Sequence, residues 1–445
     1  MWIGIDDTDS RNEGCTTFIA YEMAAGFSQM MRGYPRLVRL NPNLKYKTRG
    51  NGALSLNFSE NLKDPESNLK IGSHEGKRIE VSGEIVEYGE PDLDGRELLE
   101  RIYSIVEKYY VRNQPDTNPG VVVSKNKFDS GIYRMALERE IPLEYIESVL
   151  IDTGSFYRKE GNGRGIIGAT ASIAWDRKRI TYELLNYKYP NGGYIDETVK
   201  LRIGRIAESY GSTFNNMEET DGKVCLFPRD RTPVIYGIRG MDPEDLMSIQ
   251  QEISEVYPEF GKNFMIFETN QGTDDHIIKP SEGKTLEEMA SYVIEGYVVS
   301  PPGRRAGGHL FFTVKSGKRT VDAIAFEPSK GFRDRLETLR VNDFVRIFGS
   351  LSRGAIKIEK LEVLARALVY ERRVPKCKIC GEKTLNVGSL KYKCTECGFL
   401  QDPDYVRIVT ESGCIRMEPP VYARRHLSMP WKLEKVNFPG EDHEF

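Results

Sequence analysis

Four of the seven cysteines stand in two Cys-x-x-Cys pairs in the C-terminal part of the chain. Cys377 and Cys380 form the first pair, thirteen residues follow, and Cys394 and Cys397 form the second. This spacing is typical of a zinc ribbon, in which four thiolates complete a tetrahedral structural site and leave no position open for catalysis. We therefore expect a zinc ribbon over residues 372–402, with a C-terminal tail over residues 403–445.

An acidic cluster follows the first few residues of the chain. Residues 2–5 read as a short buried strand, and Asp6, Asp7 and Asp9 come directly after it. Crowded carboxylates repel one another and raise each other's pKa unless a cation neutralises them. Mg²⁺ is the hard cation that suits carboxylates together with a phosphate substrate. The alternative is an acidic turn in which Asp9 or Ser10 caps the next helix.

A turn rich in glycine and hydroxyl groups comes next. Gly14 and Cys15 precede Thr16 and Thr17, and residues 18–25 have the spacing of a helix with one apolar face. Such a turn at the start of a helix offers N–H groups and the positive end of the helix dipole to an anion. Acidic metal ligands beside an anion-binding turn predict a nucleotide-phosphate site that uses ATP and Mg²⁺.

The length and the distribution of charge limit the classes of protein. A chain of 445 residues is long enough for three or four domains. It has no apolar run of about 18 residues and no secretory signal pattern, so we expect a cytoplasmic protein with no membrane partner. Residues 301–376 carry 17 Lys and Arg against 8 Asp and Glu, whereas residues 1–300 have a net charge of −12. A basic segment beside an acidic one indicates that the basic part binds a polyanion.

The pattern of elements predicts a multidomain α+β protein. Residues 1–193 read as an α/β domain with several glycine-rich turns. Residues 194–280 interleave helices and strands in the manner of a ferredoxin-like domain, including expected strands at 223–227 and 234–239. Residues 285–368 show five strands with a single helix between the third and fourth, which is the order of an OB-fold β-barrel.

The expected barrel carries residues suited to RNA. OB-folds bind oligonucleotides through a strand face and its loops, with cations on phosphates and rings on bases. Of the adjacent Phe311 and Phe312, one must face the core because strand side chains alternate. The candidate nucleic-acid-binding residues are Arg304, Arg305, Phe312, Lys315, Lys318 and Arg319.

The chain contains none of the common nucleotide-binding fingerprints. It has no P-loop, no protein-kinase motif set and no dinucleotide-binding glycine motif. Other residues must then contact phosphates, and a glycine-dense loop at 161–168 is one candidate, although it could equally be a flexible turn. The candidate phosphate ligands are Lys47, Arg49, Gly14, Thr17, Gly161, Gly163, Arg164 and Gly165.

Several motifs, taken in order, resemble the archaeal isoleucine-tRNA 2-agmatinylcytidine (agmatidine) synthetases. They are Ile3-Gly-Ile-Asp-Asp-Thr-Asp-Ser10, Cys15-Thr-Thr17, Lys47-Thr-Arg-Gly-Asn-Gly-Ala53, Gly161-Asn-Gly-Arg-Gly-Ile-Ile-Gly168, Thr213-Phe-Asn-Asn216 and Tyr236-Gly-Ile-Arg-Gly240. The resemblance continues through the basic barrel into the cysteine pairs and so covers nearly the whole chain.

This resemblance implies an ATP-dependent ligase with a kinase-like N-terminal domain. Such an enzyme attaches agmatine to C2 of the wobble cytidine of isoleucine tRNA with anticodon CAU, after phosphorylating the C2 oxygen, so that AUA is decoded. It implies catalytic roles for Asp7, Asp9, Thr16, Lys47 and Arg49, with Thr16 as phosphate acceptor and Thr17 as the alternative.

Two other functions fit parts of the pattern. One is a non-catalytic tRNA- or single-strand-binding protein whose first domain senses a nucleotide. The other is an RNA-modifying ligase that adenylates its base, but the chain lacks the Ser-Gly-Gly-x-Asp-Ser loop of such enzymes.

Overall fold

The structure is a computed structural model with two compact units. It describes residues 1–11, 13–48, 50–60, 68–83, 85, 93–188, 195–228, 232–281, 285–388, 390–408 and 415–436. Unit 1 comprises residues 1–292, 349–353 and 418–445, and unit 2 comprises residues 293–348 and 354–417. The second unit is therefore an insertion in the first, and each unit is described by itself below.

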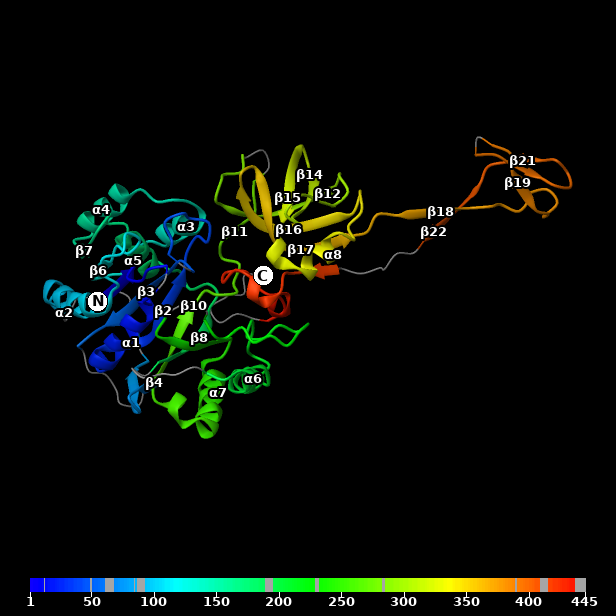
Figure 1. Ribbon diagram of the computed structural model, residues 1–445. Helices are drawn as coiled ribbons and strands as arrows, with labels where there is room; N and C mark the ends of the chain where they lie inside the picture. Colours follow the sequence, from blue (N-terminus) through cyan, green and yellow to red (C-terminus); the bar gives the residue numbers. More distant parts are fainter. Residues whose placement is uncertain are drawn as a thin grey trace. The chain divides into compact units, whose positions relative to one another are not determined.

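Unit 1 is built around one mixed sheet with helices on both faces (Figure 1). Its elements in chain order are β1 (Trp2–Asp6), α1 (Thr16–Phe27), β2 (Met31–Arg39), β3 (Gly52–Phe58), β4 (Asn68–His74), β5 (Lys77–Ser82), α2 (Gly95–Tyr109), β6 (Gly120–Ser124), α3 (Ser130–Glu138), α4 (Leu143–Asp152), β7 (Phe156–Lys159), α5 (Gly165–Ile173), β8 (Thr181–Tyr187), α6 (Glu197–Glu208), β9 (Val234–Gly240), α7 (Pro243–Val256), β10 (Phe264–Thr269) and β11 (Ile277–Ile278).

The ten strands of this sheet lie in the order β7-β6-β1-β3-β2-β5-β4-β10-β8-β9. Strand β1 pairs antiparallel with β3 on one side and β6 on the other. Because strand side chains alternate, Ile3 and Ile5 pack toward α1 and α2, whereas Trp2 and Val122 pack toward α3, α4 and α5. Asp7, which follows β1, therefore leaves the sheet at a place where helices cover both of its faces.

The sheet continues without a break beyond the expected boundary at residue 193. Strand β8, which the sequence placed in the first domain, pairs antiparallel with both β10 and β9, and β10 also pairs with β2. Helices α6 and α7 pack with these strands around a separate apolar cluster. The expected strand at 223–227 is wrong, because Val224 makes only an isolated bridge to Met217.

Unit 2 contains a closed barrel. Its elements are β12 (Ser291–Val298, of which the first two residues belong to unit 1), β13 (Gly303–Arg304), β14 (Leu310–Ser316), β15 (Arg319–Ala325), α8 (Gly331–Leu336), β16 (Phe344–Ser352), β17 (Ala355–Ala365), β18 (Val369–Arg373), β19 (Thr384–Asn386), β20 (Tyr392–Cys394), β21 (Leu400–Gln401), β22 (Asp404–Ile408) and β23 (Ile415–Met417). The path β12-β16-β17-β15-β14 closes where β14 pairs with β12. Five barrel strands with α8 between the third and fourth match the expected element order.

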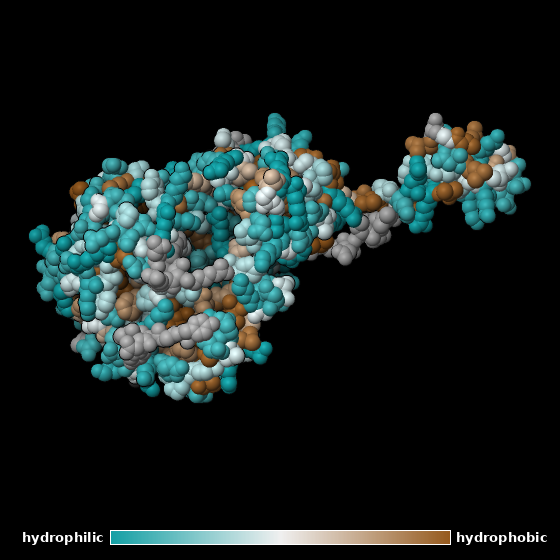
Figure 2. Space-filling view, viewed as in Figure 1, coloured by the Kyte–Doolittle hydropathy of each residue, from teal (hydrophilic) through white to brown (hydrophobic). Residues whose placement is uncertain are grey.

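The cysteine pairs lie between β18 and β22, which pair antiparallel from Val369↔Ile408 to Arg373↔Asp404. Strands β19, β20 and β21 form a small sheet of their own in this segment. The surface of the segment between β18 and β22 mixes hydrophilic and hydrophobic side chains (Figure 2). Ile379 and Leu385 are among its exposed apolar residues.

The expected tail at 403–445 is not a single element. Strands β22 and β23 belong to unit 2, and β23 pairs with β17. The segment from 418 onward belongs to unit 1, where Leu427 is buried in the core that includes α3 and α5. No helix among the described residues is long and apolar enough to cross a membrane.

Candidate active site

Asp6 ends β1 and is enclosed by helix α5. A Cβ atom placed on Gly168 would lie 1.8 Å from Asp6 Oδ2, so only glycine allows the helix to approach this carboxylate. Burial, followed by the nearby charge of Asp7, raises the pKa of Asp6 well above its ordinary value. The site therefore contains an acid whose charged form the protein alone does not stabilise.

Asp7 turns the chain away from the sheet. Its φ of 57° lies in the left-handed region, which Asp adopts more readily than most non-glycine residues. Asn118 donates its backbone N–H to Asp7 O over 3.1 Å and its side-chain amide to Asp7 Oδ2 over 3.2 Å. Burial outweighs this hydrogen bond and raises the pKa of Asp7 to about 7.

Asp9 does not cap the next helix. Cys15 is the residue that precedes α1, and no side chain caps that helix. Asp9 instead accepts a hydrogen bond from the Thr48 hydroxyl, with 2.8 Å between Thr48 Oγ1 and Asp9 Oδ1. The expected acidic helix cap is thereby ruled out, and Asp9 is tied to the turn that follows Lys47.

Asp6 and Asp7 line a small pocket of about 80 Å³ together with Lys47 and Arg164. Arg164 is anchored there by an ion pair with Glu140 of 3.1 Å, and it stacks on the ring of Tyr46. The pocket thus brings together two acidic and two basic candidate residues from distant sequence positions, and their roles as Mg²⁺ and phosphate ligands stay predictions.

A larger cavity of about 620 Å³ lies in the same unit, and Asp9, Thr16 and Thr17 line it. Both threonines stand in the first turn of α1, whose N–H groups have no partners within the helix. The Thr17 hydroxyl lies 2.9 Å from the Cys15 sulfur. Thr48 and Asn51 line both the cavity and the smaller pocket, so the two hollows adjoin at this turn.

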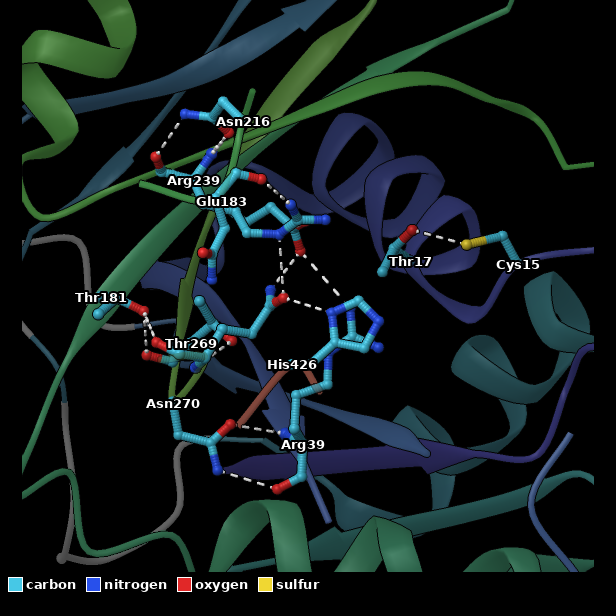
Figure 3. Close-up of polar contacts among 12 residues, drawn as sticks. Cys15, Thr17, Arg39, Thr181, Glu183, Asn216, Arg239, Thr269, Asn270 and His426 are labelled. Carbon is cyan, nitrogen blue, oxygen red and sulfur yellow. Dashed lines mark hydrogen bonds and ion pairs between the residues drawn. The ribbon is translucent and has the colours of Figure 1, made fainter. Parts of the chain in front are cut away.

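The opposite part of the cavity lining is a charged network that the sequence analysis missed (Figure 3). Glu183 is 3 % exposed in its side chain and lies between two guanidinium groups, 3.2 Å from Arg239 Nε and 3.6 Å from Arg39 Nη2. Gln271 donates to Glu183 Oε2 over 2.5 Å. The available signal was a single charged residue inside each of two mostly buried strands, Glu183 in β8 and Arg239 in β9.

The predicted glycine loop does not form a phosphate cradle. Gly161 and Gly163 line neither hollow, and the amides of Asn162, Gly163 and Arg164 already donate within the turn or to Asn118. Gly165 begins α5, where a Cβ atom would lie 2.4 Å from the backbone of Gly120. Gly165 thus allows close packing of α5 on the sheet, whereas Gly161 and Gly163 have positive φ angles and lie against the side chains of Asn118 and Lys159.

Two other candidates are not found in either hollow among the described residues. Gly14 lines neither hollow, but its φ of 81° lets the chain turn against Asp9. Arg49 lies outside the described residues.

The four cysteines converge in an arrangement that could hold a metal ion. Their sulfur atoms all lie within 4.8 Å of one another, and they form the single group of three or more convergent His, Cys, Asp or Glu ligands in the described part of the chain. Four thiolates are the donor set of a structural zinc site. Asp6, Asp7 and Asp9 do not converge to this degree, since the first two line the small pocket and Asp9 lines the cavity.

The barrel brings its candidate residues to two places. Lys315, Lys318 and Arg319 lie at the hairpin between β14 and β15. At the other end of β14, Arg304 is already paired with Glu337 at 2.8 Å and with Asp334.

The choice of Phe312 was wrong. Its ring is 2 % exposed and belongs to the barrel core, whereas Phe311 faces outward and Arg305 stacks on it at 4.3 Å. Alternation along β14 exposes one ring of the pair and buries the other, and sequence alone did not decide which.

Comparison with known proteins agrees with this architecture. The TiaS TCKD domain model matches residues 2–160, and the TiaS FLD domain model matches residues 163–276. The chain belongs to the TiaS family. The boundary between the two TiaS models falls before β8, whereas the sequence analysis had placed it at 193.

Curated TiaS relatives match nearly the whole chain. The isoleucine-tRNA 2-agmatinylcytidine synthetase TiaS of Thermoplasma volcanium is 38% identical over 437 residues, which cover 98% of each chain. The protein of the same name from Methanocaldococcus jannaschii is 33% identical and covers 97% of this chain and 98% of its own.

Solved TiaS structures are also similar. The TiaS chain in a crystal structure with isoleucine tRNA and ATP has 30% sequence identity to this chain and a TM-score of 0.76. The match covers 99% of this chain and 98% of that TiaS chain. The TiaS chain in a complex with isoleucine tRNA, AMPCPP and agmatine has 28% sequence identity to this chain and a TM-score of 0.75. This match also covers 99% of this chain and 98% of that TiaS chain.

The raised pKa of Asp7 predicts a pH-dependent effect of Asp7→Asn. The pKa is about 7 in the folded protein, against about 3.9 in an unfolded chain. The folded state therefore holds this proton more tightly, and the carboxyl costs stability progressively as the pH rises from about 4 to about 7. Asn cannot ionise, so in the presence of a chelator the variant should gain roughly 2 °C or more in Tm over wild type at pH 8 relative to pH 5.

Differential scanning calorimetry at both pH values measures this gain. Asp152→Asn, at an exposed position on α4, is the matched control and should show no pH-dependent difference. An equal Tm difference at pH 5 and pH 8 for Asp7→Asn would contradict the burial argument.

Proposed function

We propose that this chain attaches agmatine to C2 of the wobble cytidine of isoleucine tRNA with anticodon CAU, in a reaction that consumes ATP. The similarity to TiaS enzymes over 98% of the chain carries this proposal. It is supported by the TiaS complexes that contain isoleucine tRNA, ATP and agmatine. A non-catalytic RNA-binding role is not favoured, because the relatives matched over their full length are named as synthetases.

The chemistry requires activation of the base. The C2 carbonyl oxygen of cytosine is a poor leaving group, so a phosphoryl group from ATP is first transferred to that oxygen. The agmatine amine then attacks C2, the C–O bond breaks, and the oxygen leaves as part of inorganic phosphate. An anticodon base is already unpaired and can enter a pocket at little cost.

The two adjoining hollows suit these two steps. Lys47 and Arg164 in the small pocket would meet phosphate oxygens, while Asp6 and Asp7 would hold Mg²⁺ there. Asp9, on the wall of the adjoining cavity, would be a further ligand once an ion draws the carboxylates together. The raised pKa values of Asp6 and Asp7 fit this assignment, since two enclosed carboxylates favour a bound cation. The cavity of about 620 Å³ has room for a base and a small amine.

The two threonines differ in availability as phosphate acceptors. The Thr17 hydroxyl already contacts Cys15, and its carbonyl accepts from Tyr187. Thr16 lines the same cavity, and its hydroxyl makes no hydrogen bond to the described part of the chain. Thr16 is therefore the preferred acceptor and Thr17 the alternative.

Unit 2 would hold the tRNA. Its basic OB-fold, with Lys315, Lys318 and Arg319 on one hairpin, suits the phosphate backbone, and the four thiolates suit a zinc ribbon. In this assignment the first half of the chain comprises a kinase-like segment and a ferredoxin-like segment that share one sheet.

Labelled agmatine tests the proposed reaction directly. Full-length protein, ATP, radiolabelled agmatine and unmodified isoleucine tRNA should give label in the tRNA. Asp9→Asn should lower the rate by about 100-fold or more, because a charge at the reacting phosphate is lost. Its tRNA affinity, measured by filter binding, should stay within about twofold, because the phosphates of the tRNA body contact other residues.

Asp152→Asn is again the matched control and should retain the wild-type rate. Tight tRNA binding by the wild-type protein without incorporation of label would refute the synthetase assignment in favour of the binding module.

A second experiment distinguishes the threonines. After incubation with ATP, Thr16→Ala should lack any covalent phosphate that the wild-type protein carries, whereas Thr17→Ala should retain it. Mass spectrometry of peptides from α1 locates the phosphate. Phosphate that persists in Thr16→Ala and disappears in Thr17→Ala would exchange the two roles.

A third experiment concerns the ribbon. Elemental analysis should find about one zinc ion per chain, and Cys394→Ser with Cys397→Ser should remove it, because two of four ligands are lost. Cys225→Ser, outside the ribbon, should keep the zinc. The double variant should bind tRNA more weakly yet bind ATP normally; a zinc-free wild-type protein would contradict the ribbon.

A further inference from the structure

The segment from 418 to 436 returns to unit 1 and supplies part of the cavity wall. Its backbone is fixed by two hydrogen bonds of 2.8 Å, from Gly272 N to His426 O and from Asp274 N to Leu427 O. Leu427 is 1 % exposed. The adjacent His426 is accessible and lines the cavity, so a buried anchor holds the imidazole at the wall.

The imidazole completes the charged network of the wall (Figure 3). His426 Nδ1 lies 2.9 Å from Gln271 Oε1, which also accepts from Arg239 Nε over 3.2 Å. Since this oxygen is an acceptor, Nδ1 must carry the proton and donate. The amide of Gln271 in turn donates to Glu183, so His426 adds a third hydrogen bond to a Gln271 side chain that already joins Arg239 to Glu183.

The same ring supports the turn shared by the two hollows. A Cβ atom on Gly50 would lie 3.1 Å from His426 Nε2 and 2.6 Å from Arg39 Nη1, so the backbone at Gly50 lies close against these two side chains. Thr48, which donates to Asp9, and Asn51 flank Gly50 in this turn. The imidazole therefore lies beside both the charged network of the cavity wall and the turn that contains Thr48 and Gly50.

A neutral imidazole fits this position. The positive charge of Arg39, with that of Arg239, holds the pKa of His426 well below its ordinary value. The neutral ring can donate from Nδ1 without adding a third positive charge beside Arg39 and Arg239.

We propose that His426 is a positioning residue for agmatine transfer. Its hydrogen bond to Gln271 helps to keep Glu183 and Arg239 in place. Its contact with Gly50 helps to keep the turn that contains Thr48, and through Thr48 the Asp9 carboxylate, at the cavity. This inference rests on the proposed function and adds to it a residue from the far end of the chain. Loss of the imidazole should slow the reaction without weakening tRNA binding.

The test compares three variants in the full-length, zinc-containing protein with the labelled-agmatine assay. His426→Ala should lower kcat by about tenfold or more, because misplaced reacting groups are costly, with the KM for tRNA within about twofold. His426→Asn keeps an N–H near the position of Nδ1 and should recover most of the rate. Lys432→Ala, exposed on the same segment, should match wild type.

A double-mutant cycle with Gln271→Ala adds a readout that general destabilisation would not produce. If His426 acts through Gln271, the double variant should be no slower than the slower single variant. Should His426→Ala prove unstable by its Tm, His426→Asn and Gln271→Ala carry the comparison.

Three results would overturn the inference while leaving the proposed function intact: a wild-type kcat in His426→Ala, equal losses in the Ala and Asn variants, or additive losses in the cycle. Absence of label with the wild-type protein would overturn the proposed function, and this inference with it.

Discussion

The close approach of helix α5 to the sheet governs the geometry of the catalytic half. A Cβ on Gly4 would lie 2.2 Å from Ala169 O, and one on Gly120 would lie 2.2 Å from Ile166 N. With Gly168 facing Asp6, these glycines allow the helix backbone to rest on β1 and β6. The same contact places Arg164, at the start of α5, in the pocket of Asp6 and Asp7. A larger side chain at any of the three positions would push the helix, and with it a phosphate-binding candidate, away from the acids.

The continuous sheet makes the cavity a joint product of the two family segments. Strand β10 pairs in parallel with β2 at Glu268↔Arg36 and antiparallel with β8. Arg39, at the end of β2, can therefore reach Glu183 on β8, beside Arg239 on β9. Neither segment alone contains both partners of the Arg39–Glu183 pair. Burying Glu183 is tolerable because two guanidinium groups and an amide surround it, and removing one of them would leave a costly unpaired charge.

Local patterns predicted the elements well and the long-range contacts poorly. Periodicity located α1 and the barrel strands, and the spacing of the cysteines predicted that their four sulfur atoms converge, because these signals are local in the sequence. The role of the glycines at 161–165 stays a prediction, since glycine density does not distinguish a phosphate cradle from a tight turn or, as at Gly165, from close helix packing. Asn118, which links Asp7 to the turn at Asn162, carried no local signal apart from its place before β6.

The insertion of unit 2 within unit 1 changes what a C-terminal truncation would mean. The chain leaves unit 1 after residue 292 and returns to it for good at 418, so a truncation near 285 removes the barrel, the ribbon and the segment with His426 together. It also removes Leu427, whose burial beside α3 and α5 contributes roughly 1.5–3 kcal/mol to the catalytic core. Lost activity in such a fragment would therefore reflect an incomplete cavity as well as absent tRNA-binding surfaces. Because unit 1 is completed only by its last segment, the cavity can form only after the barrel and the ribbon have been synthesised.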